Sequence, residues 1–248
     1  MESAKSDSPA QPNKSLLNGI ACFQVVAAEK MPLGSREIAR RLGLGHTRVS
    51  RLLGTLASLG LVARTKNRKY IPGPGIHVLS AQSLHGSGLL SAAIPVLRRI
   101  HARRMIVALG VLWGSSVCYL VHAKPGQDPD DGIGAHSPYA AEDSVIGHVL
   151  LSYSSQEELY DGFIEQVGPE YAEEIRQRRA VCIRRSDGSL SAAAAIFSPQ
   201  NETEPIAAIA LTGLCSKRLA DRILHILVDA AKRIAASLED PALSASDE

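Results

Sequence analysis

The chain has 248 residues, of which 45% are hydrophobic and 21% charged, and its formal net charge is +2. This length suffices for one large domain or two ordinary ones, and the composition is that of a globular protein. No run of about 18 apolar residues is present, which excludes a membrane-spanning helix. Residues 1–13 lack the apolar segment of a signal peptide, so they and residues 240–248 are expected to be disordered tails of a cytoplasmic protein.

The first part of the chain predicts two short helices. One is expected over residues 14–29, with Asn13 or Ser15 as its N-cap. The second is expected to begin at the N-cap Ser35 and to end at Gly43, which suits a left-handed C-terminal residue. The side chains of the first helix that we expect to face a core are Leu16, Leu17, Ile20 and Phe23.

A third helix is predicted to begin at His46 or Thr47 and to end near Leu59. Gly54 costs about 1 kcal/mol there relative to alanine, but a small residue on an outer face permits close approach to another surface. The apolar residues with the spacing of one buried face are Val49, Leu52, Leu53 and Leu56. The polar residues at the start and on the outer face are His46, Thr47, Arg48, Ser50, Arg51 and Thr55.

The stretch LVARTKNRKYIPG predicts two short strands around a turn, and thus a winged helix–turn–helix domain over residues 14–75. Its hairpin carries Arg64, Lys66, Arg68 and Lys69. Eleven Lys or Arg and two acids lie between Lys14 and Pro74, whereas fifteen bases and twenty-one acids follow. A basic head on an acidic body is typical of a nucleic-acid reader joined to another domain. We therefore predict that double-stranded DNA binds to the hairpin, the outer face of the third helix, Ser35 and Arg36. The alternative is that these charges only keep the head solvated.

The rest of the chain predicts a linker and a second domain. Residues 76–104 read as a linker helix with a break near Gly86 and Gly88, and residues 105–239 as an α+β domain of one antiparallel sheet with helices on its faces. Strands are expected at 105–113, 116–123, 180–185, 190–197 and 205–212, with SDGS as a hairpin turn. Helices are expected at 142–153, at 155–163 with a capping box from Ser154 and Glu157, at 169–179, and from an N-cap at Ser216 onward.

Four motifs carry a resemblance to a known family. The run EIARRLGLGHTRVSRLLGTLASLGLV resembles the helix–turn–helix of the IclR family of bacterial transcriptional regulators. IGHVLLSY stands where that family has A-G-K-a-L-L-A, SAAAAIF where it has c-I-A-a-P-v-F, and IAAIALTG where it has v-a-A-i-s-v-s-G. The resemblance covers roughly residues 14–238. It implies a winged helix–turn–helix domain, a linker helix and a C-terminal GAF-like effector-binding domain.

The resemblance also implies partners and a ligand site. The expected partners are double-stranded operator DNA, a second copy of the chain in a homodimer or a tetramer, and a small organic effector. The effector is expected to be an aromatic or apolar acid. Asp187 is the nearest counterpart of the family's acidic pocket residue, and Ser191 stands at the position of a frequent pocket cysteine. The residues expected around the effector are Trp113, Tyr119, Ser144, Ile146, Gly147, Asp187, Ser191 and Thr212.

Catalytic and metal-binding motifs are missing from the sequence. There is no G-x-S-x-G elbow or P-loop, and no two histidines are closer than eight residues. Asp128, Asp130 and Asp131 match only a fragment of a calcium loop. We therefore expect no metal, no cofactor and no enzymatic activity. The alternative is a metabolite-binding protein or enzyme with an incidental basic N-terminal domain, which salt-dependent binding to duplex DNA would distinguish.

Overall fold

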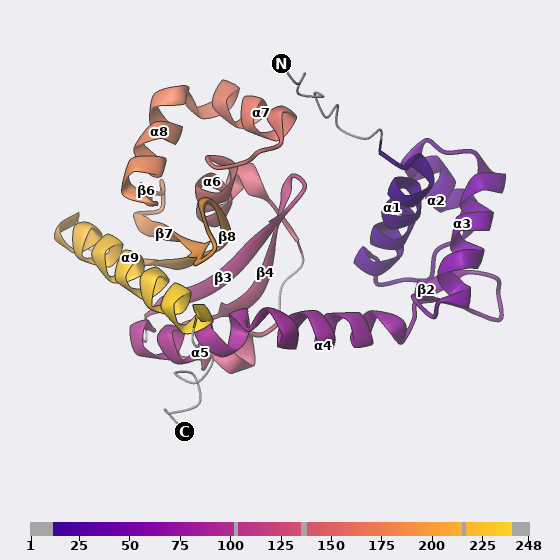
Figure 1. The fold of residues 1–248 in the computed structure, drawn as a ribbon, viewed down its shortest axis with the longest axis horizontal. Coiled ribbons are helices and arrows are strands. Elements are labelled where there is room, and N and C mark those ends of the chain that lie inside the picture. Colours follow the sequence, from indigo (N-terminus) through magenta and orange to yellow (C-terminus); the bar gives the residue numbers. More distant parts are fainter. Residues whose placement is uncertain (1–11, 102–103, 135–137, 215–216, 240–248) are drawn as a thin grey trace, which may run out of the picture. The chain divides into compact units, whose positions relative to one another are not determined.

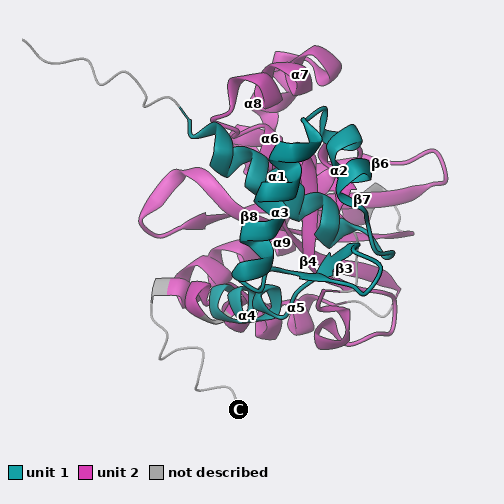
Figure 2. Cartoon of the chain, turned by 90° about the vertical axis from the view of Figure 1, so that its right-hand side faces the viewer, with its two compact units in different colours: residues 1–83 teal, residues 84–248 magenta. Residues whose placement is uncertain are grey.

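The computed structural model describes residues 12–101, 104–134, 138–214 and 217–239 (Figure 1). The chain divides into two compact units, Met1–Ser83 and Leu84–Glu248 (Figure 2). Residues 1–11 of the tail expected at 1–13, the tail expected at 240–248 and the expected N-cap Ser216 lie outside the described residues. Within these ranges, no helix has the length and apolarity needed to cross a membrane.

Unit 1 is a three-helix head with a two-stranded wing. Its buried cluster draws every member from residues 22–70, with Ile38, Val49 and Leu53 fully buried. Asn13 caps the first helix as predicted, because its side chain accepts hydrogen bonds from the backbone N–H groups of Ser15 and Leu16. The elements are α1 (Lys14–Ala28), α2 (Ser35–Leu42), α3 (His46–Ser58), β1 (Val62–Arg64) and β2 (Tyr70–Pro72).

Two predictions about the first helices are wrong. The N-cap of α2 is Gly34 rather than Ser35, which is already helical. Helix α1 turns Gly19, Cys22 and Val26 toward the core, with Cys22 and Val26 buried. This face lies against α3, where a Cβ on Gly19 would be 3.8 Å from Leu52, and it brings Cys22 and Val26 into one cluster with Val49 and Leu53. The predicted face is exposed instead, at 62% for Leu16, 54% for Leu17 and 39% for Ile20, and only Phe23 packs partly against the core.

Two helices lead from the head into unit 2. They are α4 (Gly75–Ser87) and α5 (Leu89–Ile100), and the break between them is the predicted one. Gly88 makes this break with a φ of 63°, a left-handed conformation that favours glycine. Helix α5 then buries its apolar side, including Ala93 and Leu97, against the sheet of unit 2.

Unit 2 is an antiparallel sheet of six strands in the order β5-β4-β3-β8-β7-β6. One buried cluster joins α5 and α9 to one face of the sheet, and a second joins α6, α7 and α8 to the other (Figure 1). The α+β class is thereby confirmed. The strands are β3 (Met105–Trp113), β4 (Ser116–Ala123), β5 (Tyr139–Ala140), β6 (Ala180–Arg184), β7 (Ser189–Ser198) and β8 (Asn201–Leu214).

The helices of unit 2 differ from expectation mainly at their starts. The predicted capping box does not form: Ser154 Oγ accepts from the backbone N–H of Gln156, which is itself the N-cap of α7. The expected helix 142–153 is divided, because a 3₁₀ turn (η2, Ala141–Asp143) precedes α6. A further 3₁₀ turn, η1, spans Pro129–Gly132, and the α-helices are α6 (Val145–Leu151), α7 (Glu157–Val167), α8 (Pro169–Arg178) and α9 (Lys217–Glu239).

Candidate DNA-reading surface and ligand cavity

The outer face of α3 consists of exposed polar side chains. Val49 and Leu53 are fully buried and fix the rotation of the helix. Arg48 and Arg51 make no ion pair with another described residue, so their charges face solvent uncompensated. We define the reading surface as the six exposed polar residues between positions 46 and 55 of α3: His46, Thr47, Arg48, Ser50, Arg51 and Thr55.

The arginines of α2 differ sharply from those of α3. Arg40 binds Glu37 at 2.7 Å, and Arg41 binds Glu37 at 2.9 Å and Glu29 at 2.5 Å. Hydrogen bonds from Arg40, and to a smaller extent from Arg41, lower the pKa of the Glu37 carboxyl to about 2. The two acids of the head therefore neutralise Arg40 and Arg41 and leave the reading surface basic.

The starts of α2 and α3 are joined by a hydrogen bond between Ser35 Oγ and His46 Nε2, which lie 3.0 Å apart. The N-caps Gly34 and Gly45 offer no side-chain hydrogen bond, so backbone N–H groups at both helix starts remain for an outside acceptor. Arg36 is exposed in the first turn of α2. Helix N-termini of this kind favour phosphate groups.

The wing presents four exposed cations, Arg64, Lys66, Arg68 and Lys69. Thr65 stabilises the turn of the wing through two hydrogen bonds to Lys69. Thr65 Oγ1 accepts from the Lys69 N–H at 3.1 Å, and the backbone N–H of Thr65 donates to Lys69 O at 2.8 Å. Arg68 has a φ of 58° at this turn. Two hydrogen bonds between Leu33 and Tyr70 tie the hairpin to the segment before α2.

Neutralising the wing is expected to weaken DNA binding regardless of sequence. The double variant Lys66→Gln/Arg68→Gln should flatten the dependence of log Kd on log salt by nearly two ions, because each phosphate contact releases about one counterion. The measurement is a salt titration with selected and random duplexes. Gln in place of Lys124, an exposed cation of unit 2, is the control. An unchanged slope of log Kd against log salt would show that the wing does not contact DNA.

Unit 2 contains a cavity of about 290 Å³ between the sheet and the start of α6, and we call it the ligand cavity. Its apolar wall is formed by Ile106, Ala108, Val145 and Ala210. Three residues predicted from the sequence line it: Tyr119, Asp187 and Thr212. The sequence did not indicate the apolar wall, nor the polar lining residues His122, Tyr139, Asp143, Arg185 and Ser189.

Arg185 is the principal cation of the ligand cavity. Its Nε donates to Ser191 Oγ at 3.3 Å and its Nη2 to the backbone oxygen of Asp143 at 3.4 Å. Thr212 Oγ1 donates to the same Ser191 oxygen at 3.1 Å. Ser191, which is 1% exposed, therefore orients Arg185 from behind the cavity wall. A positioned guanidinium beside hydroxyls and an apolar wall suits an organic carboxylate.

The remaining predicted site residues lie outside the ligand cavity. Ser144 caps α6 through the N–H of Gly147 and bonds Tyr119 OH at 3.0 Å, so it supports a lining residue. Ile146 is fully buried in the core. A Cβ on Gly147 would lie 1.9 Å from the backbone oxygen of Ala141, so this glycine allows η2 and α6 to touch. Trp113 is 61% exposed at the end of β3.

His148 is a structural residue of α6. Its Nε2 lies 2.7 Å from the backbone oxygen of Glu142, to which it donates, and its Nδ1 lies 3.0 Å from Tyr171 OH. Burial lowers the pKa of His148, and burial also raises the pKa of Tyr171 to about 12. The neutral ring thus joins η2 to α8. Across the described ranges, no group of three His, Cys, Asp or Glu is placed to hold a metal ion.

Comparisons with known proteins match both units. A family model described as the IclR helix-turn-helix domain matches residues 15–66. The chain is 28% identical over 162 residues to the HTH-type transcriptional regulator KdgR of Dickeya chrysanthemi, a match that covers 63% of this chain and 52% of that regulator. The chain therefore spans about half the length of this curated relative.

Solved structures resemble the whole fold. A putative IclR transcriptional regulator from Silicibacter sp. TM1040 has a TM-score of 0.71 at 19% identity, with coverage of 90% of this chain and 96% of that one. An IclR homolog from Microbacterium hydrocarbonoxydans, solved with 4-hydroxybenzoate, has a TM-score of 0.64 at 17% identity, with coverage of 91% and 99%. At these identities the likeness concerns the fold.

Proposed function

Residues 15–66 match the IclR helix-turn-helix domain, and from this premise we propose that the chain is a transcriptional regulator of the IclR family that binds operator DNA through unit 1 and a small organic acid through unit 2. The observation that carries the DNA-binding role is the contrast between α2 and α3. Acids bind Arg40 and Arg41, whereas Arg48 and Arg51 on the reading surface have no acidic partner among the described residues. Free cations on a helix of the right length for the major groove serve phosphates and base edges.

The proposed complex contains at least two copies of the chain. One helix of 13 residues, the length of α3, reads only a few base pairs. Two tethered copies multiply both affinity and specificity, and they read a palindromic operator. A homodimer, or a tetramer made of two such dimers, meets this requirement. The regulator is a repressor or an activator according to where its operator lies.

Binding-site selection on the purified chain tests the DNA-binding role. We expect enrichment of an inverted repeat whose half-sites are separated by about one helical turn. Recovery of random sequence only, with binding that does not weaken as salt rises, would instead favour the alternative of a metabolite-binding protein or enzyme with an incidental basic head. We assign no catalytic step to this chain.

The ligand cavity is proposed to hold the effector. It combines Arg185 with the hydroxyls of Tyr119 and Thr212 and an apolar wall. The structural relative solved with 4-hydroxybenzoate makes hydroxylated aromatic acids the first compounds to try. An effector can change operator affinity only by the difference in its own affinity for the two states of the protein.

Removing the guanidinium from the cavity is expected to abolish most carboxylate binding. A carboxylate that stabilises the wild type should bind Arg185→Met more than tenfold more weakly, since a hydrogen bond to a charged group contributes about 1.5–3 kcal/mol. Thermal unfolding with a panel of aromatic acids measures this, because a ligand at a hundredfold its Kd adds roughly 2.7 kcal/mol of stability. Arg178→Met on the exposed side of α8 is the control. Equal shifts for wild type and Arg185→Met would place the effector elsewhere.

A further inference from the structure

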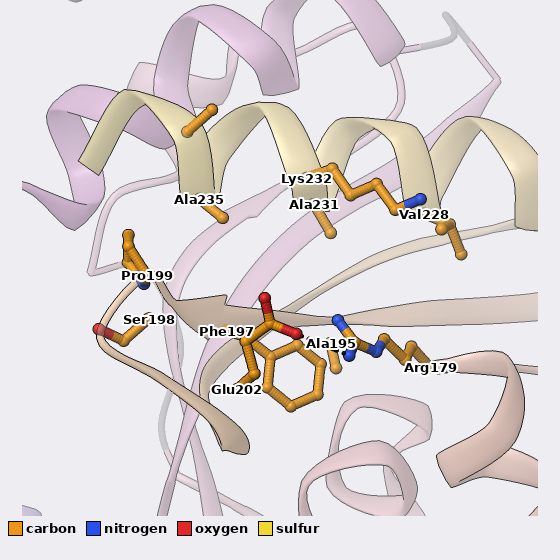
Figure 3. A pocket seen from close by; sticks show the side chains of 11 residues that line it. Arg179, Ala195, Phe197, Ser198, Pro199, Glu202, Val228, Ala231, Lys232 and Ala235 are labelled. Atoms are coloured by element: carbon orange, nitrogen blue, oxygen red, sulfur yellow. Dashed lines mark hydrogen bonds and ion pairs between the residues drawn. The ribbon is translucent and has the colours of Figure 1, made fainter. Parts of the chain in front are cut away.

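A second cavity, of about 340 Å³, lies in unit 2 where α9 passes the end of β7 (Figure 3). It shares no lining residue with the ligand cavity. The pairing of β6 with β7 ends at Ala180 and Ala194, so the following residues of β7 lie at an open edge of the sheet. Ala195 and Phe197 from this edge, Arg179 from the end of α8, and one side of α9 form the walls. We call this space the α9 cavity.

Arg179 is fixed at the α9 cavity by contacts on three sides. Its backbone oxygen accepts from the N–H of Ala195 at 2.9 Å, its Cζ lies 4.6 Å from the centroid of the Phe197 ring, and its Nη2 lies 3.0 Å from Glu202 Oε2. Its φ of 55° is a left-handed conformation that costs a residue with a Cβ about 1–2 kcal/mol and that glycine adopts freely. An arginine at a position suited to glycine indicates that this side chain has a use there.

The charges around the α9 cavity are predominantly positive. Lys232 on α9 is exposed and makes no ion pair with another described residue. Glu202 is the single acid among the residues lining the cavity, and it already faces Arg179. The side chains of Arg179 and Glu202 are 44% and 71% exposed, so water screens their pairing and a competing anion can replace Glu202. Figure 3 shows the guanidinium and this carboxylate meeting beneath α9.

The same cavity has an apolar surface. Val228, Ala231 and Ala235 line the α9 side, whereas the Phe197 ring, 6% exposed, points away from α9 (Figure 3). Small side chains at positions 231 and 235, one helical turn apart, leave the space that a bulkier pair would fill. A volume of about 340 Å³ is that of a small-molecule site. Inorganic phosphate would use only the cations, whereas an amphipathic anion would use both surfaces.

We propose that the α9 cavity is a second binding site for a small carboxylate with an apolar body, beyond the effector role assigned to the ligand cavity. The carboxylate accepts hydrogen bonds from Arg179, in place of Glu202, and from Lys232. The apolar body lies against Val228 and the alanines of α9. The chain thereby has two sites for organic acids, which share no lining residue.

Methyl NMR on the full-length chain, labelled at alanine methyl groups and titrated with benzoate, tests this proposal. The methyls of Ala231 and Ala235 report the α9 cavity, and those of Ala108 and Ala210 report the ligand cavity. We expect benzoate to shift the first pair. Lys232→Met should weaken this binding roughly tenfold, and Glu202→Gln should tighten it roughly threefold by freeing Arg179.

Three controls separate the possible outcomes. Arg233→Met changes a neighbouring cation that does not line the cavity, and it should leave the benzoate titration unchanged. Benzamide, which has the same shape without the charge, should leave the methyl resonances of Ala231 and Ala235 nearly unshifted. The proposal is overturned if Ala231 and Ala235 stay unshifted, if benzamide acts like benzoate, or if Lys232→Met has no effect. A response confined to Ala108 and Ala210 would overturn this second site while leaving the proposed effector cavity standing.

Discussion

Replacing Gly147 by alanine is expected to destabilise unit 2 by about 3 kcal/mol or more, the upper range for overpacking a core. The added Cβ would lie 1.9 Å from the backbone oxygen of Ala141 and 2.5 Å from its carbonyl carbon. Both are backbone atoms, so no side-chain rotation relieves the clash, and η2 must separate from α6. Hydrogen exchange at the amides of β7 and β8 measures the loss as reduced protection.

Gly162→Ala in α7 is the matched control. Nothing lies within 4 Å of a Cβ at that position, and its backbone is helical. There the substitution should stabilise the helix by about 0.5–1 kcal/mol, because alanine has the higher helix propensity. If Gly147→Ala and Gly162→Ala had similar protection from hydrogen exchange, η2 and α6 would not be in backbone contact at Gly147.

Arg48→Ala is expected to cost about 1–3 kcal/mol of affinity for the selected operator and to relax the preference at one base position. Arg48 lies in the first turn of α3, beside the buried Val49 and on the outward side. No described acid pairs with the Arg48 guanidinium, so no ion pair has to break before Arg48 binds DNA. The measurement is Kd on the selected duplex and on single-base variants of it.

Arg40→Ala supplies the comparison for this experiment. Arg40 is also an exposed arginine, but Glu37 already binds it at 2.7 Å. Its removal should produce a smaller loss, equal on operator and random DNA, without any change of base preference. An equal loss on both kinds of DNA for Arg48→Ala would make Arg48 a phosphate contact rather than a reader of bases.

The sequence predicted most of this fold because several signals were local. The spacing of Val49, Leu53 and Leu56 defines the buried face of α3, and these residues are buried in the structure. Gly43 has the expected left-handed conformation, with a φ of 62°. The SDGS segment forms the expected turn between β6 and β7, closed by a hydrogen bond from the Gly188 N–H to Arg185 O.

Other features depend on contacts that periodicity does not encode. Helix α1 has two apolar stripes, and the buried one is the stripe that packs against α3, a tertiary contact that hydrophobicity alone does not select. Arg185 adjoins a turn rich in polar residues, so nothing local distinguishes it from Arg184. Its place in the ligand cavity follows from the approach of β6 to η2, where it reaches Asp143.

Gly147 and Ser144 show a subtler difference between sequence and structure. Gly147 belongs to a motif that indicates a ligand site, Ser144 lies two residues before that motif, and both lie near the ligand cavity. Yet Ser144 acts through Tyr119, and Gly147 acts by letting two backbone segments touch. A motif of this kind preserves the wall of a cavity as well as the atoms that face its contents, and sequence alone does not separate the two roles.

The buried cluster of the head is complete within residues 22–70, and unit 2 has two clusters of its own. Each half of the chain therefore carries the hydrophobic contacts that specify its fold. A gene segment encoding the head can recombine with another sensor without leaving unmatched core surfaces at the junction. Operator preference and ligand preference are then separately heritable traits, and a population can change one while selection maintains the other.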